Sequence, residues 1–485
     1  MSISASLSNA LTGLAAASRS AQVVSSNVSN ALTEGYARRQ IDLSPRYVDG
    51  SGAGVQIDGI SRIVDETLLR EKRLSAAATG NANVAYDFNS EILNLIGAPD
   101  TAGSLSSRVT GFETALLEAA SRPDSEARLN GVLIAAQSLT GKLNEVSDGV
   151  QALREDADGR IEREIAGLNT ALEQISELNG QILRAKANDQ DYPALLDQRQ
   201  KLIDDISELV PIRQIPREND TVALYTIGGA LLLDIEPAEF GFEARAPITP
   251  DMTLASGALS GLTINGTPVL TSGTGSAIAG GVLAGLFSVR DEFAVAVQDN
   301  VDEVARDLVV RFESPALDPS LLAGDPGLFT DSGAALNPAD LTGLAGRLEV
   351  NALVDPAQGG ATWRLRDGIG AVAPGSVGDA TLLEAKLAIL GEARAPVGGS
   401  FSGAGKSAAG FAASLTSLAG QSVLGSSTRL SFEVARFEGL EETFLANGVD
   451  TDQEMQNLLL IEQAYAANAR VIQTADEMLQ ILMGL

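Results

Sequence analysis

The sequence contains no cysteine and no histidine, and only 4% of its 485 residues are aromatic. Without Cys and His the chain has no thiol nucleophile, no disulfide, no zinc site built from these residues and no imidazole general base. Basic residues are also scarce, because 34 Lys and Arg stand against 63 Asp and Glu, for a formal net charge of −29. A chain this acidic is repelled by phosphate backbones, so we expect no nucleic-acid binding.

Long apolar runs are missing as well. The longest candidate, 278–289, is rich in glycine and shorter than the ~20 residues that a membrane span needs. No Lys or Arg precedes the apolar N-terminal stretch, in which Arg19 is the first charge. We therefore expect no membrane insertion and no cleaved signal peptide.

The first thirty residues carry a heptad pattern with almost no charge. Apolar side chains recur at alternating spacings of four and three, which places them along one side of a helix that packs against another helix. The opposite side is Ser, Asn and Gln, which suits a helix surrounded by copies of itself, because burying a charge there costs energy. The predicted N-terminal assembly interface is Ile3, Leu7, Leu14, Ala21, Val24 and Val28.

The C-terminus carries a matching pattern, in which Asn468 is a polar break of the kind that fixes coiled-coil register. Thr451 and Glu454 have the spacing of a capping box at the start of this helix. The two patterns predict a coiled coil between the chain ends, and a helical hairpin that closes an ordinary domain is the alternative. The predicted C-terminal assembly interface is Leu458, Ile461, Tyr465, Asn468, Ile472, Ala475, Leu479 and Leu482.

Two motifs lie at these ends: SNVSNALTEGY at 26–36, which includes Asn27, Asn30, Gly35 and Tyr36, and EMQNLL at 454–459, continued by QAYAANARVIQTADEML at 463–479. Together they resemble the terminal motifs of the rod, hook and hook-associated axial proteins of the bacterial flagellum. The segment LLDQRQKLI at 195–203 resembles the hook-associated members in particular.

Between the ends, helical periodicity resumes near residue 65 and continues in a very long run over 124–185. Pro193 predicts the first position of another helix. Residues 221–233 and 262–270 predict two hairpins, the second with an Asn265-Gly266 turn of type I′. Further strands are expected at 348–353 and 362–365, and helices at 282–308, from 382 and over 411–445.

These elements predict a mainly α fold with a β insert, in a nested multidomain arrangement. We expect a terminal coiled-coil domain at 1–45 and 441–485, a helical body at 46–209 and 280–440 with a strand-rich and loop-rich stretch at 314–374, and an inserted β domain at 210–279. The long helical body argues against a hook or distal-rod protein, because the resemblance implies mostly β structure between the termini of those relatives.

No motif for chemistry emerges. The glycines at 273–281 lack the spacing and the Lys of a phosphate loop, and Asp318, Asp325 and Asp331 lack the spacing of a calcium loop. We expect no catalytic residue, no cofactor and no metal. A secreted hydrolase that uses two carboxylates stays as a remote alternative, because Asp and Glu suffice for that reaction.

The resemblance implies a structural subunit at the junction between hook and filament, required for filament assembly. It implies an extracellular protein exported by the flagellar type III apparatus. The implied partners are copies of the chain in a ring or helical layer, the hook protein on the proximal side, hook-associated protein 3 on the distal side and a cytoplasmic export chaperone at the C-terminal region. A hook or distal-rod axial protein is the alternative.

Overall fold

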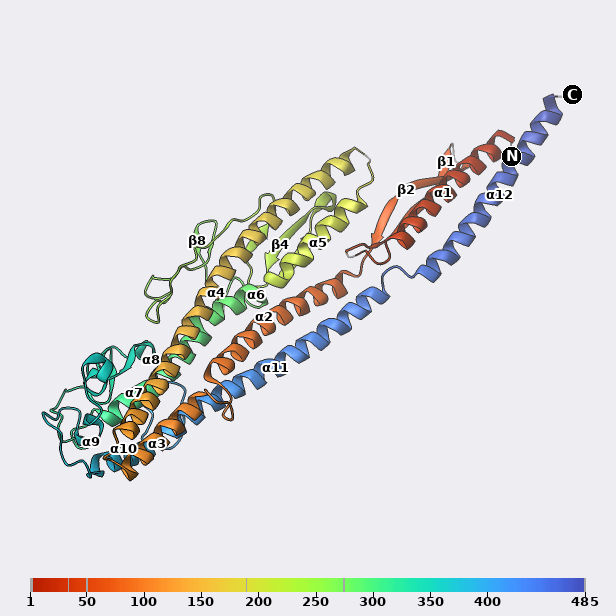
Figure 1. Cartoon of the computed structure of the whole chain (residues 1–485). Helices are drawn as coiled ribbons and strands as arrows, with labels where there is room; N and C mark the ends of the chain where they lie inside the picture. Colours follow the sequence, from red (N-terminus) through yellow and green to blue (C-terminus); the bar gives the residue numbers. More distant parts are fainter. Residues whose placement is uncertain (1–2, 34, 49–50, 189, 274, 484–485) are drawn as a thin grey trace.

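The computed structural model describes residues 3–33, 35–48, 51–188, 190–273 and 275–483. Long helices run along an elongated molecule, and small β-sheets lie beside them (Figure 1). The predicted fold class, mainly α with β elements inserted, is confirmed.

The two terminal helices lie side by side at one end of the molecule (Figure 1). Helix α1 (Ile3–Ser29) and helix α12 (Thr451–Met483) run antiparallel, so the first turns of α1 lie near the last turns of α12. A long antiparallel hairpin, β1 (Arg38–Val48) and β2 (Ser51–Ile63), packs on α1. The N-terminal helix therefore lies between the C-terminal helix and a β ribbon.

Long helices build most of the body. Helix α2 (Glu66–Ile96) packs along α11 (Ala408–Ala446), and α3 (Leu105–Ser121) packs on α4 (Glu126–Ala187). Helix α4 has 62 residues, so it is about 90 Å long. Helix α5 (Pro193–Leu209) returns along α4 and begins with Pro193 at its first position, as predicted. Buried apolar residues in nearly every turn of α4 hold this helix in the core.

A helical segment with one irregular turn completes the core. Helix α6 (Gly281–Ser288) continues through a π-helical turn (Val289–Phe293) into α7 (Ala294–Phe312). Phe112 of α3, Phe312 of α7 and Phe329 form an aromatic cluster with ring centroids 5.1–5.9 Å apart. Helix α10 (Thr381–Gly391) covers α3.

Two three-stranded antiparallel sheets occupy the predicted β region. The first contains β3 (Ile212–Pro216), β4 (Val222–Thr226) and β5 (Leu231–Leu233). The second contains β6 (Phe240–Gly241), β7 (Thr263–Ile264) and β8 (Thr267–Pro268). Asn265 and Gly266 have φ angles of 50° and 74°, as a type I′ turn requires. Both predicted hairpins are confirmed.

One predicted strand is wrong. Strand β9 (Phe329–Asp331) pairs with β10 (Leu348–Val350), which confirms a strand within 348–353. Residues 362–365 instead lead into a helical turn, α9 (Arg364–Asp367), which follows another short helix, α8 (Leu344–Arg347). Arg364 Nη1 donates hydrogen bonds to the carbonyls of Ile369 and Ala371, and these bonds close the chain into a turn.

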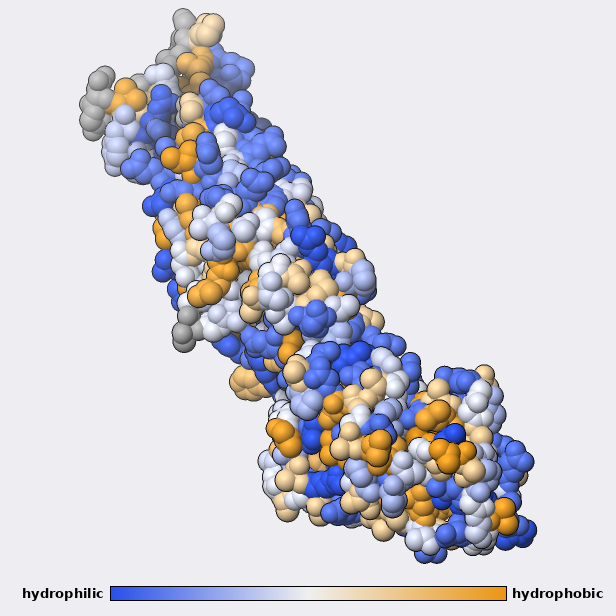
Figure 2. All heavy atoms as spheres, turned by 90° about the vertical axis from the view of Figure 1, so that its left-hand side faces the viewer, coloured by the Kyte–Doolittle hydropathy of each residue, from blue (hydrophilic) through white to orange (hydrophobic). Residues whose placement is uncertain are grey.

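The proposed division into terminal, body and β parts stays a prediction. Its boundary at residue 45 falls inside β1, and its boundary at residue 440 falls inside α11. Exposed hydrophobic residues are scattered in small groups over the face that Figure 2 shows. Among the described residues, no helix is long and apolar enough to cross a membrane.

Candidate functional site

Asn27 joins the end of α1 to the following strand and to α12. The residue is 1% exposed, and its Nδ2 donates hydrogen bonds to the Arg39 carbonyl at 2.9 Å and to Glu454 Oε2 at 3.2 Å. Its Oδ1 accepts from the Arg39 N–H at 3.0 Å and from the Tyr36 hydroxyl at 2.9 Å. Because an unpaired buried polar group costs about 1–3 kcal/mol, this position strongly favours an amide that both donates and accepts.

Glu454 of α12 accepts the hydrogen bond from Asn27. It is also 1% exposed, and its Oε1 accepts from Arg38 Nε at 2.7 Å. The prediction that Glu454 completes a capping box is wrong. Asp450 caps α12 instead, because its carboxylate accepts from the N–H groups of Asp452 and Gln453. Glu454 therefore links the two ends of the chain.

Asp197 of α5 connects this region to the body. Its carboxylate accepts from Arg39 Nη2 of β1 and from Arg62 Nε of β2, each at 2.7 Å. The Arg39 guanidinium also stacks 4.8 Å from the centroid of the Tyr36 ring. We call the group Asn27, Arg38, Arg39, Arg62, Asp197 and Glu454 the joint, because it connects α1, α12, the hairpin and α5.

The other residues of the N-terminal motif shape the turn that leads into the joint. Asn30 Nδ2 donates to the Ser26 carbonyl at 2.9 Å. Gly35 has a φ angle of +77°, a backbone conformation that glycine adopts without steric cost. Tyr36 follows at once and places its hydroxyl between Asn27 and Ser26. The four predicted motif residues thus lie together around the end of α1.

The predicted α1 interface lies along the contact with α12 and the hairpin. Val24 is buried, and Ile3, Leu7, Leu14, Ala21 and Val28 are half-buried. At the middle of the contact, a Cβ on Gly13 would lie 2.8 Å from the side-chain oxygen and nitrogen of Asn468. The Asn468 side chain therefore fits only against a helix that has no side chain at that point.

On α12 the predicted residues divide into two groups. Ala475 is buried, and Leu458, Ile461, Asn468 and Ile472 are half-buried. Tyr465 and Leu479 remain 44% and 38% exposed. The side chain of Leu482 lies outside the described residues. Whether these residues contact other subunits stays a prediction.

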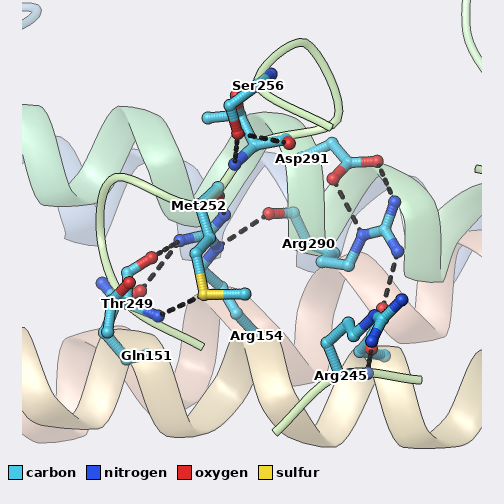
Figure 3. Close-up of polar contacts among 10 residues, drawn as sticks. Gln151, Arg154, Arg245, Thr249, Met252, Ser256, Arg290 and Asp291 are labelled. Atoms are coloured by element: carbon cyan, nitrogen blue, oxygen red, sulfur yellow. Dashed lines mark hydrogen bonds and ion pairs between the residues drawn. The ribbon is translucent and has the colours of Figure 1, made fainter. Parts of the chain in front are cut away.

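A second polar cluster lies inside the body, where it fixes the loop before β7 (Figure 3). Arg154 of α4 is 1% exposed and donates to the carbonyls of Arg290 at 3.0 Å, Thr249 at 3.2 Å and Met252 at 2.6 Å. Arg290, fully buried in the π-helical turn, pairs with Asp291 at 2.8 Å and with Asp158 at 2.6 Å. Burial lowers the pKa of Arg154. Its donors bind backbone carbonyls and Gln151 Oε1, so the cluster has a structural role.

The described residues contain no group of three or more Asp or Glu side chains arranged to hold a metal ion. Asp318, one of the three aspartates considered above, instead accepts from Ser320 and from the Ile369 N–H. It organises the loop that precedes β9.

Sequence reasoning found Asn27 and Tyr36 but missed the charged residues of the joint. Asp197 lies inside the 195–203 segment, and Arg38 and Arg39 form a basic pair directly after Tyr36 in an acidic chain. The 195–203 segment and the basic pair are therefore visible in the sequence. Their pairing with Asp197 and Glu454 depends on contacts between residues more than 150 positions apart.

Comparisons with known proteins find that parts of this chain are similar to flagellar proteins. Residues 90–316 match the family described as the flagellar hook-associated protein FlgK helical domain, and residues 445–485 match the C-terminal family of flagellar basal body rod FlgEFG proteins. A solved structure of the flagellar hook junction protein FlgK from Burkholderia pseudomallei overlays with a TM-score of 0.44 at 18% identity, over 54% of this chain and 47% of that one.

Two relatives carry the same name. Flagellar hook-associated protein 1 of Salmonella typhimurium is 26% identical over 243 residues, which is 48% of this chain and 43% of the relative. The Bacillus subtilis protein of that name is 24% identical over 241 residues, 47% of each chain. The match thus spans less than half the length of these curated relatives. The helical body and the C-terminal helix are both matched, so over these segments the chain is similar to flagellar hook-associated and axial proteins, the resemblance that its terminal motifs and its 195–203 segment predicted.

Proposed function

We propose that this chain is a structural subunit that joins the flagellar hook to the filament and is required for filament assembly. The observation that carries the proposal is the joint, in which the N-terminal and C-terminal family motifs meet through the Asn27–Glu454 hydrogen bond. The paired terminal helices form one end of an elongated subunit and the body forms the other (Figure 1). Such a subunit is suited to stacking in a tube, with its coil in one layer and its body in another.

The outer side of α1 supports self-association. Arg19 is the only charged residue between Ile3 and Ser29. The exposed positions of α1 carry Ser, Ala, Leu and Gln, so its outward side is neutral and small. A helix that faces only water normally carries charges that solvate it. A neutral side instead favours close contact with other helices in a ring or helical layer of copies.

Further partners follow from the same proposal. The hook protein would contact the subunit on the proximal side and hook-associated protein 3 on the distal side. A cytoplasmic chaperone would hold the C-terminal region before the type III apparatus exports the chain with an uncleaved N-terminus. Exposed apolar residues on α12, among them Leu459, Leu460 and Ile481, supply a surface that such a chaperone would cover. The role is structural rather than catalytic.

The decisive experiment is electron microscopy of cells that lack the gene, with an assay for flagellin in the medium. We expect complete hooks without filaments, and flagellin lost to the medium. Absence of hooks would instead indicate a rod or hook protein. Normal filaments would contradict a flagellar junction role, and purified protein that cleaves peptidoglycan would instead support the carboxylate-dependent hydrolase.

A further inference from the structure

A cavity of about 1000 Å³ lies beside the joint, between the β2 strand, the start of α2, helix α5 and strand β3. Its lining includes six cationic residues: Arg19, Arg62, Arg73, Lys186, Arg199 and Arg217. So many cations around one space are unexpected in a chain with a formal net charge of −29.

Two of these arginines are buried and have donors to spare. Arg73 is 5% exposed, and its Nε and Nη1 donate to Asp204 at 2.6 Å and to Gln214 Oε1 at 2.8 Å. Its Nη2 is buried and has no hydrogen-bond partner in the described structure. Arg199 is 6% exposed and forms no ion pair among the described residues, because its Nη1 donates only to Asn179 Oδ1 and to the Asp220 carbonyl.

Two glutamines add donors to the same wall. Gln214 Oε1 accepts from Arg73, and Gln200 Oε1 accepts from Arg62 Nη2 at 2.6 Å. Since an arginine can only donate, each glutamine must turn its oxygen toward the arginine and leave its NH₂ group for another acceptor. No acceptor for either NH₂ group is found in the described structure. The wall is thus rich in donors and poor in acceptors.

The carboxylates of the cavity lie at its mouth. Five acidic residues line it, and all five are exposed: Asp42, Asp58, Glu66, Asp191 and Asp220. Asp191 pairs with Arg19, and Asp220 accepts from Lys186 at 2.6 Å and from the Tyr192 hydroxyl at 2.8 Å. Asp42 and Asp58 accept from serines across the hairpin. Among the described residues, these carboxylates leave Arg199 without an ion pair, and Arg73, which pairs with Asp204, keeps its Nη2 without a partner.

We propose that this cavity is an oxyanion site that receives a carboxylate side chain from a neighbouring copy of the chain. Charge complementarity points to that source, because each copy carries 63 acidic residues against 34 basic ones and presents an excess of carboxylates to its neighbours. Charge-assisted hydrogen bonds from Arg73 and Arg199 would hold the carboxylate, and the glutamine NH₂ groups would donate to its remaining lone pairs. Burial, with Arg62 nearby, lowers the pKa of Arg199 to about 10, which is the condition of a cation without a sufficient counter-charge.

The binding test uses the purified full chain and isothermal titration calorimetry, with N-acetyl-tetraglutamate amide as the probe and tetraglutamine as the neutral comparison. We expect tetraglutamate alone to bind. Arg199→Gln removes a charged donor, and Gln214→Glu places a carboxylate on the wall, so each should weaken binding roughly tenfold or more. Arg163→Gln, which makes the same charge change at an exposed position of α4, should bind like the wild type. Circular dichroism and melting in chloride buffer would establish that the variants fold.

The source of the carboxylate is tested in cells with a photo-crosslinking amino acid at position 190, on the exposed part of the cavity lining. We expect a crosslink between two copies of this chain that joins position 190 to an acidic peptide. Binding of inorganic phosphate as tight as that of tetraglutamate, without a copy-to-copy crosslink, would overturn the neighbouring copy as the source. Absence of binding by either anion would overturn the site itself.

This inference rests on the proposed assembly of copies, but the two fail separately. Cells with Arg199→Gln should form fewer or shorter filaments than the wild type. If they form normal filaments while cells without the gene have bare hooks, the junction role stands and the oxyanion site is wrong.

Discussion

At the scale of single residues, the joint depends on one amide. Asn27→Asp keeps the size of the side chain but replaces its donor with an oxygen that faces Glu454 Oε2, where Asn27 Nδ2 donated at 3.2 Å. We expect the docking of α12 to lose about 2–3 kcal/mol, so amide exchange in the first turns of α12 should accelerate roughly 30-fold to 150-fold. Ser25→Asp, at an exposed position of the same helix, is the control. Equal exchange in the two variants would contradict this role.

A second residue predicts how stability depends on pH. Lys386 of α10 is 1% exposed and donates to the Leu365 carbonyl at 2.9 Å. Burial lowers its pKa to about 8, and Asp318 opposes this only in part. Between this value and the unfolded pKa of about 10.4, the unfolded chain holds a proton that the folded chain releases, so stability rises with pH.

The measurement is the free energy of unfolding of the wild type relative to Lys386→Met, from pH 7 to pH 10. We expect the wild type to gain roughly 2 kcal/mol over this range relative to the variant, because the variant has no group to titrate there. A difference that stays constant with pH would show that the ammonium is not penalised by burial.

At the scale of elements, the contact between α1 and α12 depends on a glycine facing an asparagine. Gly13→Leu would place side-chain atoms where Asn468 lies, since even a Cβ would come within 2.8 Å of it. We expect overpacking of about 1–3 kcal/mol to separate the helices, seen as faster hydrogen exchange over 461–475. Asn468→Ala in the same chain should restore part of the protection. If the single and double variants exchange alike, Asn468 does not set the register.

The outward part of the same helix tests assembly rather than folding. Leu479 is 38% exposed in the subunit, so Leu479→Asp should leave the melting temperature of the body unchanged while it blocks filament growth. The reason is that a charge would be buried wherever another helix covers this position. Gln480→Asp at the adjacent, exposed position is the matched control. Normal filaments in Leu479→Asp cells would count against an interface there.

At the scale of the whole molecule, burial is distributed unevenly. Helix α4 has buried residues along its whole length, whereas α12 has two among its described side chains, Glu454 and Ala475. We expect the monomer to exchange the amides of α12 and of the first turns of α1 much faster than those of α4, and to protect them only after assembly. Hydrogen exchange with mass spectrometry on dilute monomer is the measurement. Protection of α12 equal to that of α4 would contradict folding on assembly.

The sequence by itself determined the elements whose signals are local. Apolar spacing predicted the long helix over 124–185, Pro193 predicted the start of α5, and Asn265-Gly266 predicted a type I′ turn. Each depends on residues within a few positions of one another, where backbone geometry decides the outcome. The terminal motifs predicted the similarity to flagellar axial proteins because they are carried by short continuous stretches. The strand expected at 362–365 failed because a strand needs a partner elsewhere in the chain.

Tertiary structure determined which residues far apart in the sequence contact one another. The spacing of Thr451 and Glu454 suits a capping box. Glu454 instead pairs with Arg38 and accepts a hydrogen bond from Asn27, because a buried charge-assisted hydrogen bond stabilises more than a cap at the surface. The donor-rich wall of the cavity likewise arises only when β2, α2, α5 and β3 meet. No local sequence pattern distinguishes Arg73 or Arg199. Their donors lack partners because the fold buries these side chains, and burial depends on distant residues.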